Sequence, residues 1–152
     1  MRHWVLLAVL APVTVAWAPA CASGFDDKVP DQQSIDALEA KAQQAQPREQ
    51  CFLYAQLVHE LTEYSLRQYA AGNVSKASEM LRHIQQLAHN IHLSVAEDNK
   101  RLKNAEILLR HTAFRLREML YTSSLEDRPL VEKTLAQVSE ADADAMLQVF
   151  RK

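Results

Sequence analysis

Glycine and proline are almost absent from the chain beyond residue 30, and this scarcity limits the possible folds more than any other feature. Gly72 is the only glycine after Gly24, and Pro47 and Pro129 are the only prolines after Pro30. Sheet proteins need many tight turns, which use Gly, Pro, Asn and Asp at fixed positions. Ala, Leu, Gln, Glu, Lys and Arg dominate instead, and these residues lose little conformational freedom in a helix. The sequence therefore predicts an all-α fold.

Apolar residues recur at alternating steps of three and four, the spacing of one helix face. This periodicity predicts four main helices, at about residues 47–71, 74–92, 95–121 and 129–150, and a short N-terminal helix at about 31–45. Helices with this spacing commonly pack at about 20° to one another. We therefore expect an antiparallel helical bundle of four main helices.

The residues expected to face the core share this spacing within each segment. They are Ile35, Leu38, Ala42 and Ala45; then Cys51, Tyr54, Leu57, Val58, Leu61, Tyr64 and Ser65; then Val74, Ala77, Leu81, Ile84, Ala88, Ile91 and Val95; then Leu102, Ala105, Ile107, Leu108, Leu109, Thr112, Phe114, Leu116 and Met119; and finally Leu130, Thr134, Leu135, Val138, Met146, Leu147 and Phe150. Ile107, Phe114 and Tyr121 are seven residues apart, so we expect a second apolar seam there. Glu49, Glu60, Glu63 and Arg67 are expected to be mostly solvated.

The boundary between the third and fourth helices has two interpretations. The apolar stripe passes from Val95 to Leu102 without losing phase, which fits one continuous helix. Ser94–Glu97 fits a capping box that would start a new helix, and helix-poor residues surround it. We expect a break near His92–Asn99, with the continuous helix as the alternative. Ser139–Asp142 is a further point at which a new helix could start.

Residues 1–22 predict an export signal. A basic residue, Arg2, precedes an apolar run from Trp4 to Trp17, and small residues follow. The run is shorter than the roughly 20 residues that span a bilayer, so no stable transmembrane helix is expected after cleavage. We expect an exported protein, periplasmic or secreted, with residues 23–30 as a mobile leader and 31–152 as a single helical domain.

The cleavage site decides the fate of Cys21. Cleavage after Ala22 removes it and leaves Cys51 as the only thiol, whereas cleavage after Ala20 leaves it free to form a disulfide with Cys51 or to carry a lipid anchor. An uncleaved signal would tether the protein to the membrane instead. Cys51 lies on an apolar helix face, which favours a buried, inert thiol over a nucleophile.

Net charge argues against nucleic acid as a partner. Without residues 1–22 the chain has 16 Lys and Arg against 19 Asp and Glu, so no overall positive field attracts nucleic acid or an anionic membrane. One basic row, Lys103, Arg110 and Arg117, has Arg101 and Arg115 beside it. We expect this row to be solvated or paired with the acidic last helix, and binding of an acidic partner is the alternative.

Motifs for catalysis are missing. The segment HELTE, His59–Glu63, lacks the second histidine of the HExxH zinc protease motif. There is no G-x-S-x-G elbow, no Glu-x-x-His pair of a di-iron bundle and no Cys-x-x-Cys-His haem motif. We therefore expect no catalytic or cofactor-binding residues, no metal site and no enzyme activity. The alternative is a small-ligand or metal-binding bundle that uses His83, His89, His92 or His111.

Two resemblances follow from longer segments. AAGNVSKASEML, Ala70–Leu81, resembles the turn between the helices of a tetratricopeptide repeat, in which Gly72 and Asn73 end one helix and cap the next. No second copy follows at a spacing of 34 residues, so the peptide groove of that family is not implied. DALEAKAQQAQPREQCFLYAQLVHELTEY and DNKRLKNAEILLRHTAFRL are similar to an uncharacterised family of small exported helical proteins of bacteria. This second resemblance implies export and an all-helical fold, and no activity.

These observations lead to one functional hypothesis and two alternatives. We expect a non-catalytic helical module of the bacterial cell envelope, which presents a surface to a protein partner or to a second copy of itself. A small-ligand or metal binder that uses the histidines is the first alternative. An enzyme without a recognisable motif is the second.

Overall fold

The computed structural model describes residues 30–95 and 101–151, and in this part of the chain it contains five α-helices and no strand. They are α1 (Gln32–Gln44), α2 (Pro47–Ala70), α3 (Val74–Ser94), α4 (Leu102–Thr122) and α5 (Arg128–Phe150). The all-α prediction is confirmed. The predicted export signal, leader and Cys21 lie outside the described residues, so those expectations stay predictions.

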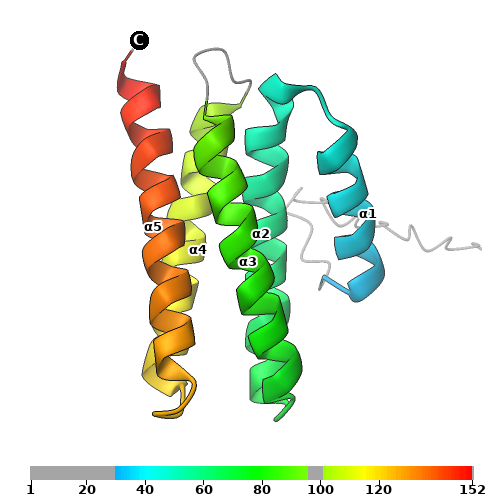
Figure 1. Ribbon diagram of the computed structural model, residues 1–152, viewed down its shortest axis with the longest axis vertical. Coiled ribbons are helices and arrows are strands. Elements are labelled where there is room, and N and C mark those ends of the chain that lie inside the picture. The colour runs from blue at the N-terminus through cyan, green and yellow to red at the C-terminus, as the bar shows by residue number, and fades with distance from the viewer. Residues whose placement is uncertain (1–29, 96–100, 152) are drawn as a thin grey trace, which may run out of the picture.

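The helices form a bundle in which α2, α3, α4 and α5 stand side by side (Figure 1). α2 packs against α3 and α4, and α5 packs against the same two helices, so α2 and α5 occupy opposite corners. The shorter α1 lies on the outer side of α2 (Figure 1). The four longer helices therefore enclose the core, and α1 covers a further face of α2.

The turn between α2 and α3 forms because Gly72 adopts a left-handed conformation, with φ +82°. The N–H of Asn73 donates to the carbonyl of Gln68, and the N–H of Gly72 donates to the carbonyl of Tyr69. These two bonds make a Schellman motif, which satisfies the last carbonyls of a helix. The side chain of Asn73 does not cap α3 as expected, because its amide donates to the Gln68 side chain instead.

α3 and α4 are separate helices, so the alternative of one continuous helix is wrong. α3 ends at Ser94, and α4 begins at Leu102 after Arg101, whose φ of 60° is left-handed. The expected capping box placed Ser94 at the start of α4, which is incorrect. Ser94 is the last residue of α3, and its hydroxyl donates to the carbonyl of Ile91. The guanidinium of Arg101 stacks on the ring of Phe52, 3.7 Å from its centre, which fixes the start of α4 against α2.

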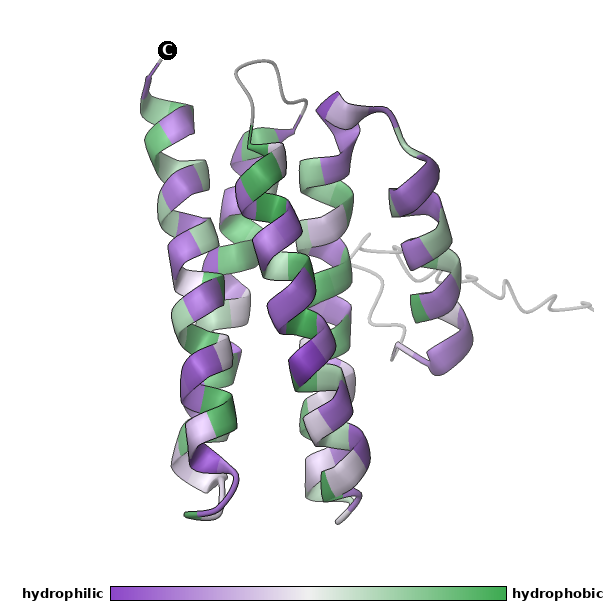
Figure 2. Ribbon diagram, viewed as in Figure 1, coloured by the Kyte–Doolittle hydropathy of each residue, from purple (hydrophilic) through white to green (hydrophobic). Residues whose placement is uncertain are grey.

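Most predicted core positions of α2, α3 and α4 are buried. Hydrophobic and hydrophilic residues alternate in short blocks along each helix, as one buried and one exposed face require (Figure 2). Leu57, Leu61, Ile84, Leu109 and Leu116 have no exposed surface, and each such side chain contributes about 1.5–3 kcal/mol relative to exposure. Several predicted core residues are only partly buried, namely Leu38, Ala45, Tyr54, Tyr64, Val95, Leu108, Leu130 and Leu135. Val74 is exposed.

The predicted core face of α5 is wrong in its second half. α5 continues through Ser139–Asp142 without interruption. Its inner stripe continues from Val138 to the small residues Ala141 and Ala145, which are buried. Met146, Leu147 and Phe150 lie on other faces of the helix and are exposed, because each is at least about 100° from Ala145 around the axis.

The start of α1 is held by its own cap and by α2. Asp31 and Ser34 form a capping box, in which each side chain bonds the backbone N–H of the other. Arg67 of α2 donates to the carbonyl of Pro30. Arg67 is therefore half-buried and bonded, not mostly solvated as expected.

Candidate functional site

The four histidines considered as ligands lie in separate places. His83 contacts a glutamate of α1, His92 pairs with an aspartate of α5, His89 is exposed, and His111 lies beside α2. Within residues 30–95 and 101–151, no group of three or more His, Cys, Asp or Glu side chains is arranged to hold a metal ion. The structure thus does not bring these four histidines together.

A polar cluster lies where α2 meets α4. His59 Nδ1 is 3.2 Å from Thr112 Oγ1, and the ring centres of His59 and His111 are 5.1 Å apart. One turn further along, Arg115 donates from Nε and Nη2 to the two carboxylate oxygens of Glu63, at 2.6 and 3.0 Å. We call these five residues the α2–α4 cluster.

The ionisation states in this cluster follow from burial and from the ion pair. Burial lowers the pKa of His59 below its usual 6.5. Burial also opposes ionisation of Glu63, but the hydrogen bonds and charge of Arg115 outweigh it and lower the pKa of that carboxyl. The bond to Glu63 in turn raises the pKa of Arg115. At neutral pH a neutral imidazole therefore lies beside a bidentate ion pair, and Glu63 bridges two helices instead of being solvated.

The cluster does not form a catalytic dyad. Thr112 is fully buried and its hydroxyl donates to the carbonyl of Leu108 at 2.8 Å, so the hydroxyl proton does not point to His59. A threonine nucleophile would need its proton directed to the base. His59 and His111 lie 52 residues apart on different helices, so only the packing of α2 on α4 sets their separation and no local sequence pattern links them.

Cys51 is buried as expected. It is a free thiol with no exposed surface, and burial raises its pKa to about 11. A thiol is nucleophilic as its thiolate, so Cys51 stays protonated and inert near neutral pH.

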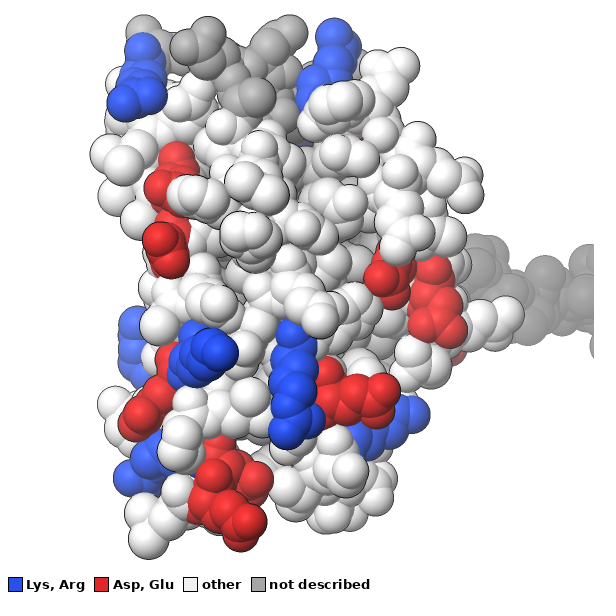
Figure 3. All heavy atoms as spheres, viewed as in Figure 1, with Lys and Arg blue, Asp and Glu red and all other residues white. Residues whose placement is uncertain are grey.

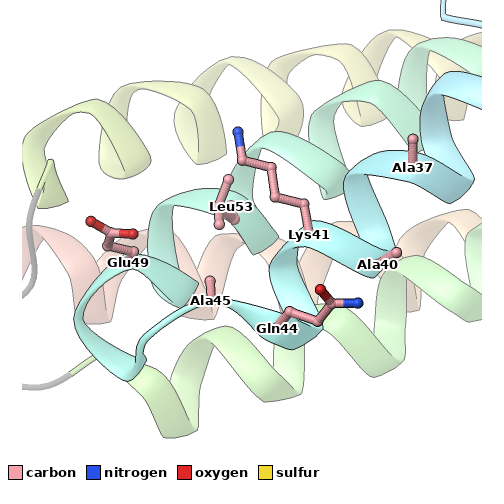
Figure 4. Close-up of a pocket in the computed structure, with 7 residues that line it drawn as sticks. All are labelled: Ala37, Ala40, Lys41, Gln44, Ala45, Glu49 and Leu53. Carbon is pink, nitrogen blue, oxygen red and sulfur yellow. The ribbon is translucent and has the colours of Figure 1, made fainter.

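A hollow of about 470 Å³ lies between α1 and the start of α2 (Figure 4). It is lined by Ala37, Ala40, Lys41, Gln44, Ala45, Glu49 and Leu53. The lining combines small apolar side chains with one cation and one carboxylate. Imidazoles, thiols and paired carboxylates, which perform acid–base or nucleophilic chemistry, are not part of it.

A row of alternating cationic and apolar side chains runs along the exposed face of α4. We call Lys103, Ile107, Arg110, Phe114, Arg117 and Tyr121 the α4 stripe. All six are exposed, and Ile107, Phe114 and Tyr121 expose 52%, 52% and 77% of their surface. The prediction that Ile107 and Phe114 broaden the core face is therefore wrong. Both lie about 140–180° around the helix axis from the buried Ala105 and Leu109.

The stripe is straight because its residues follow steps of four and three. At 100° per residue the six positions fall within an arc of about 80° along the whole of α4. Arg110 forms an ion pair with Glu106, whose carboxylate is almost fully buried. Lys103, Arg110 and Arg117 are solvated as expected, but among the described residues no ion pair joins this row to α5. Arg115 beside the row binds Glu63 of α2 and Glu118 of α4. Elsewhere, on the face seen in Figure 3, cations and carboxylates are interspersed.

Comparisons with known proteins do not assign a function. No family model matches the chain, and no curated protein or solved structure shows significant similarity to it. The two resemblances stated for the sequence stay predictions. Among the described helices, none has the length and apolar character needed to cross a bilayer.

Proposed function

We propose that this protein is a non-catalytic helical module of the bacterial cell envelope that acts by associating with a second copy of itself through the α4 stripe. In this proposal the protein is exported by residues 1–22, and α2 to α5 form an antiparallel four-helix bundle that holds α4 rigid. The observation that carries the proposal is the exposure of three large apolar residues in one row along a whole helix. Large apolar side chains aligned on one exposed helix face, with cations between them, mark this face as a candidate interaction surface.

The spacing of the stripe favours a second copy as the occupant, because the stripe is symmetric about Thr112. Lys103 and Tyr121 each lie nine residues from that point, and Ile107 and Arg117 each lie five. Arg110 and Phe114 each lie two residues from it. A twofold axis on the stripe side of α4, level with Thr112, would therefore bring each cation of one copy against an apolar residue of the other.

This antiparallel pairing makes three kinds of contact, each of them twice. Lys103 would lie over the Tyr121 ring of the second copy, Arg110 over its Phe114 ring, and the Arg117 stem along its Ile107. A cation over an aromatic ring contributes about 0.5–1 kcal/mol at exposed sites and about 2 kcal/mol when desolvated. The long alkyl stems of Lys and Arg also cover apolar surface while their charges stay near water.

A parallel arrangement of two α4 helices is disfavoured by the same residues. It would align Lys103, Arg110 and Arg117 with their own copies, so that a cation faces a cation in every second layer. Like charges held opposite each other oppose association. The stripe therefore selects one orientation, as polar residues in helical seams commonly do.

Sedimentation equilibrium tests the proposal with matched variants. The wild-type protein should form a dimer whose dissociation constant is tighter than about 1 mM, equivalent to about 4 kcal/mol. Ile107→Ser with Tyr121→Ser should yield monomers. The control, Leu93→Ser with Leu147→Ser, also removes two exposed apolar residues, but from α3 and α5, and should leave the dimer intact.

Added salt gives a second readout. The stripe brings three cations per copy into one interface, and within residues 30–95 and 101–151 only Arg110 of the three has a carboxylate partner, Glu106. Screening weakens repulsion between exposed charges, so the dimer should tighten as salt increases. A wild-type protein that stays monomeric at millimolar concentration and high salt would refute self-association.

A further inference from the structure

We propose that His59 and His111 form a binding site for a divalent transition-metal ion such as Zn²⁺, Ni²⁺ or Cu²⁺. The site uses two imidazoles, one from α2 and one from α4, and it is independent of whether the α4 stripe pairs with a second copy. It also differs from the histidine set considered from the sequence, because His59 was not among those candidates.

The geometry of the two rings is the first argument. Their centres lie 5.1 Å apart, with the ring planes inclined at 57°. Zn²⁺ binds imidazole nitrogen at about 2.0–2.1 Å, so two nitrogens on the same ion lie about 3 Å apart. Nitrogens on the rims of two rings at this separation reach that distance with small side-chain rotations. His111 is exposed, so an ion and its remaining water ligands have access from solvent.

The hydrogen bonding of His59 is the second argument. The Thr112 hydroxyl gives its proton to the carbonyl of Leu108, so it can only accept from His59 Nδ1, at 3.2 Å. His59 Nδ1 therefore carries the proton, and Nε2 keeps its lone pair. A histidine that binds a metal typically donates its other ring N–H in this way, which fixes the tautomer and the orientation of the ring.

The surrounding charges permit a cation. Glu63 lies close enough to His59 for its charge to act on the ring, and Arg115 binds that carboxylate, so one carboxylate and one guanidinium lie near the pair of rings and their charges offset each other. Two nitrogen ligands favour Ni²⁺, Cu²⁺ and Zn²⁺ over Mg²⁺ and Ca²⁺, which prefer oxygen.

Isothermal titration of the untagged protein with ZnCl₂ and with NiCl₂ at pH 7.5 tests this site. His59→Ala and His111→Ala should each weaken binding by at least about tenfold, as the loss of one of two ligands requires. His89→Ala replaces an exposed histidine of α3 away from the pair and should bind like wild type. MgCl₂ should give no binding heat in any of these proteins.

Two further readouts separate a lost ligand from a damaged fold. Thermal melting should show that His111→Ala is folded, because that side chain is exposed, and Cu²⁺ should broaden the NMR signals of residues around His59 and His111 selectively in the wild type. Binding by both His→Ala variants at wild-type affinity would overturn the proposal. So would the absence of Zn²⁺ and Ni²⁺ binding by the wild type up to about 1 mM, the limit of weak association.

Discussion

Replacing Phe114 by alanine should abolish self-association and leave the helical fold intact. Phe114 lies near the centre of the α4 stripe, two residues from the proposed twofold axis, where it would contact Arg110 of the second copy. In the separate chain 52% of its surface is exposed. Because the axis repeats the contact, one substitution removes two Phe114–Arg110 contacts from each dimer.

The magnitude follows from exposure. Complete burial of a Phe side chain contributes about 1.5–3 kcal/mol, so burying the exposed half of Phe114 contributes about 1 kcal/mol per copy. The cation above its ring adds about 1 kcal/mol when water is partly excluded. Two copies lose about 4 kcal/mol together, which weakens the dimer by roughly a thousandfold. About half of the Phe114 side chain is already buried in the separate chain. Its removal should lower the free energy of unfolding by about 1 kcal/mol, which a domain of ordinary stability tolerates.

Sedimentation equilibrium and thermal melting of Phe114→Ala measure the two effects separately. The matched control is Phe150→Ala, which removes another exposed phenylalanine, 80% accessible and on α5. The control should dimerise like wild type. If Phe114→Ala dimerises within about threefold of the control, the α4 stripe is not the interface. If Phe150→Ala is as weak as Phe114→Ala, the exposed end of α5 contributes to the contact and the proposed axis is wrong.

Three further predictions concern the fold and its ionisable groups. Leu61→Asp should lower the free energy of unfolding, measured in urea, by about 3 kcal/mol or more, because it buries a charge where the native side chain has no exposed surface. The control is Glu60→Ala at the neighbouring half-buried position, and a similar loss of stability in both variants would contradict this prediction. Burial lowers the pKa of His59 below 6.5, so its contribution to stability is complete above about pH 6.5 and is lost as the pH falls through the folded-state pKa. His59→Gln should therefore lose less stability than wild type between pH 7 and pH 5, and equal losses would refute the inferred burial. Cys51 should resist a maleimide in the native protein at pH 7.5 and react after unfolding, because its pKa of about 11 keeps it protonated; fast native labelling would show that the site opens.

The positions of the helices could be predicted from the sequence because periodicity and breakers act locally. Pro47 opens α2, Gly72 ends it, and the start of α5 falls one residue before Pro129. The start of α4 was placed seven residues too early. Ser94 and Val95 continued the apolar pattern of α3, so the pattern alone did not reveal that α4 begins after the left-handed Arg101.

The exposed α4 stripe could have been predicted from the sequence. Ile107 and Phe114 were assigned to the core because they are apolar, although their angular position on the helix places them opposite Ala105 and Leu109, which are buried. The cations Lys103, Arg110 and Arg117 share the helix face of Ile107 and Phe114, and this mixture distinguishes the exposed face from the mostly apolar buried face. The same reasoning applies to Leu147 and Phe150 on α5.

The α2–α4 cluster could not be predicted from the sequence, for a physical reason. The contact between His59 and Thr112, and that between Glu63 and Arg115, join residues 52 or 53 apart. Which turn of α2 faces which turn of α4 depends on how all the core side chains interlock. The sequence shows that α2 and α4 are both amphipathic, but no local pattern encodes the register in which they pack.

Disulfide cross-linking tests the antiparallel pairing of two α4 stripes most directly. In a chain with Cys21→Ala and Cys51→Ala, one variant carries Lys103→Cys and another carries Tyr121→Cys, and the two are mixed and oxidised. Antiparallel pairing predicts a mixed disulfide between the two variants, because these positions face each other across the axis. It also predicts no disulfide between two Tyr121→Cys chains, whose cysteines would lie about 27 Å apart along the helices. Preferential Tyr121→Cys homodimers, or no cross-link in any mixture, would contradict it.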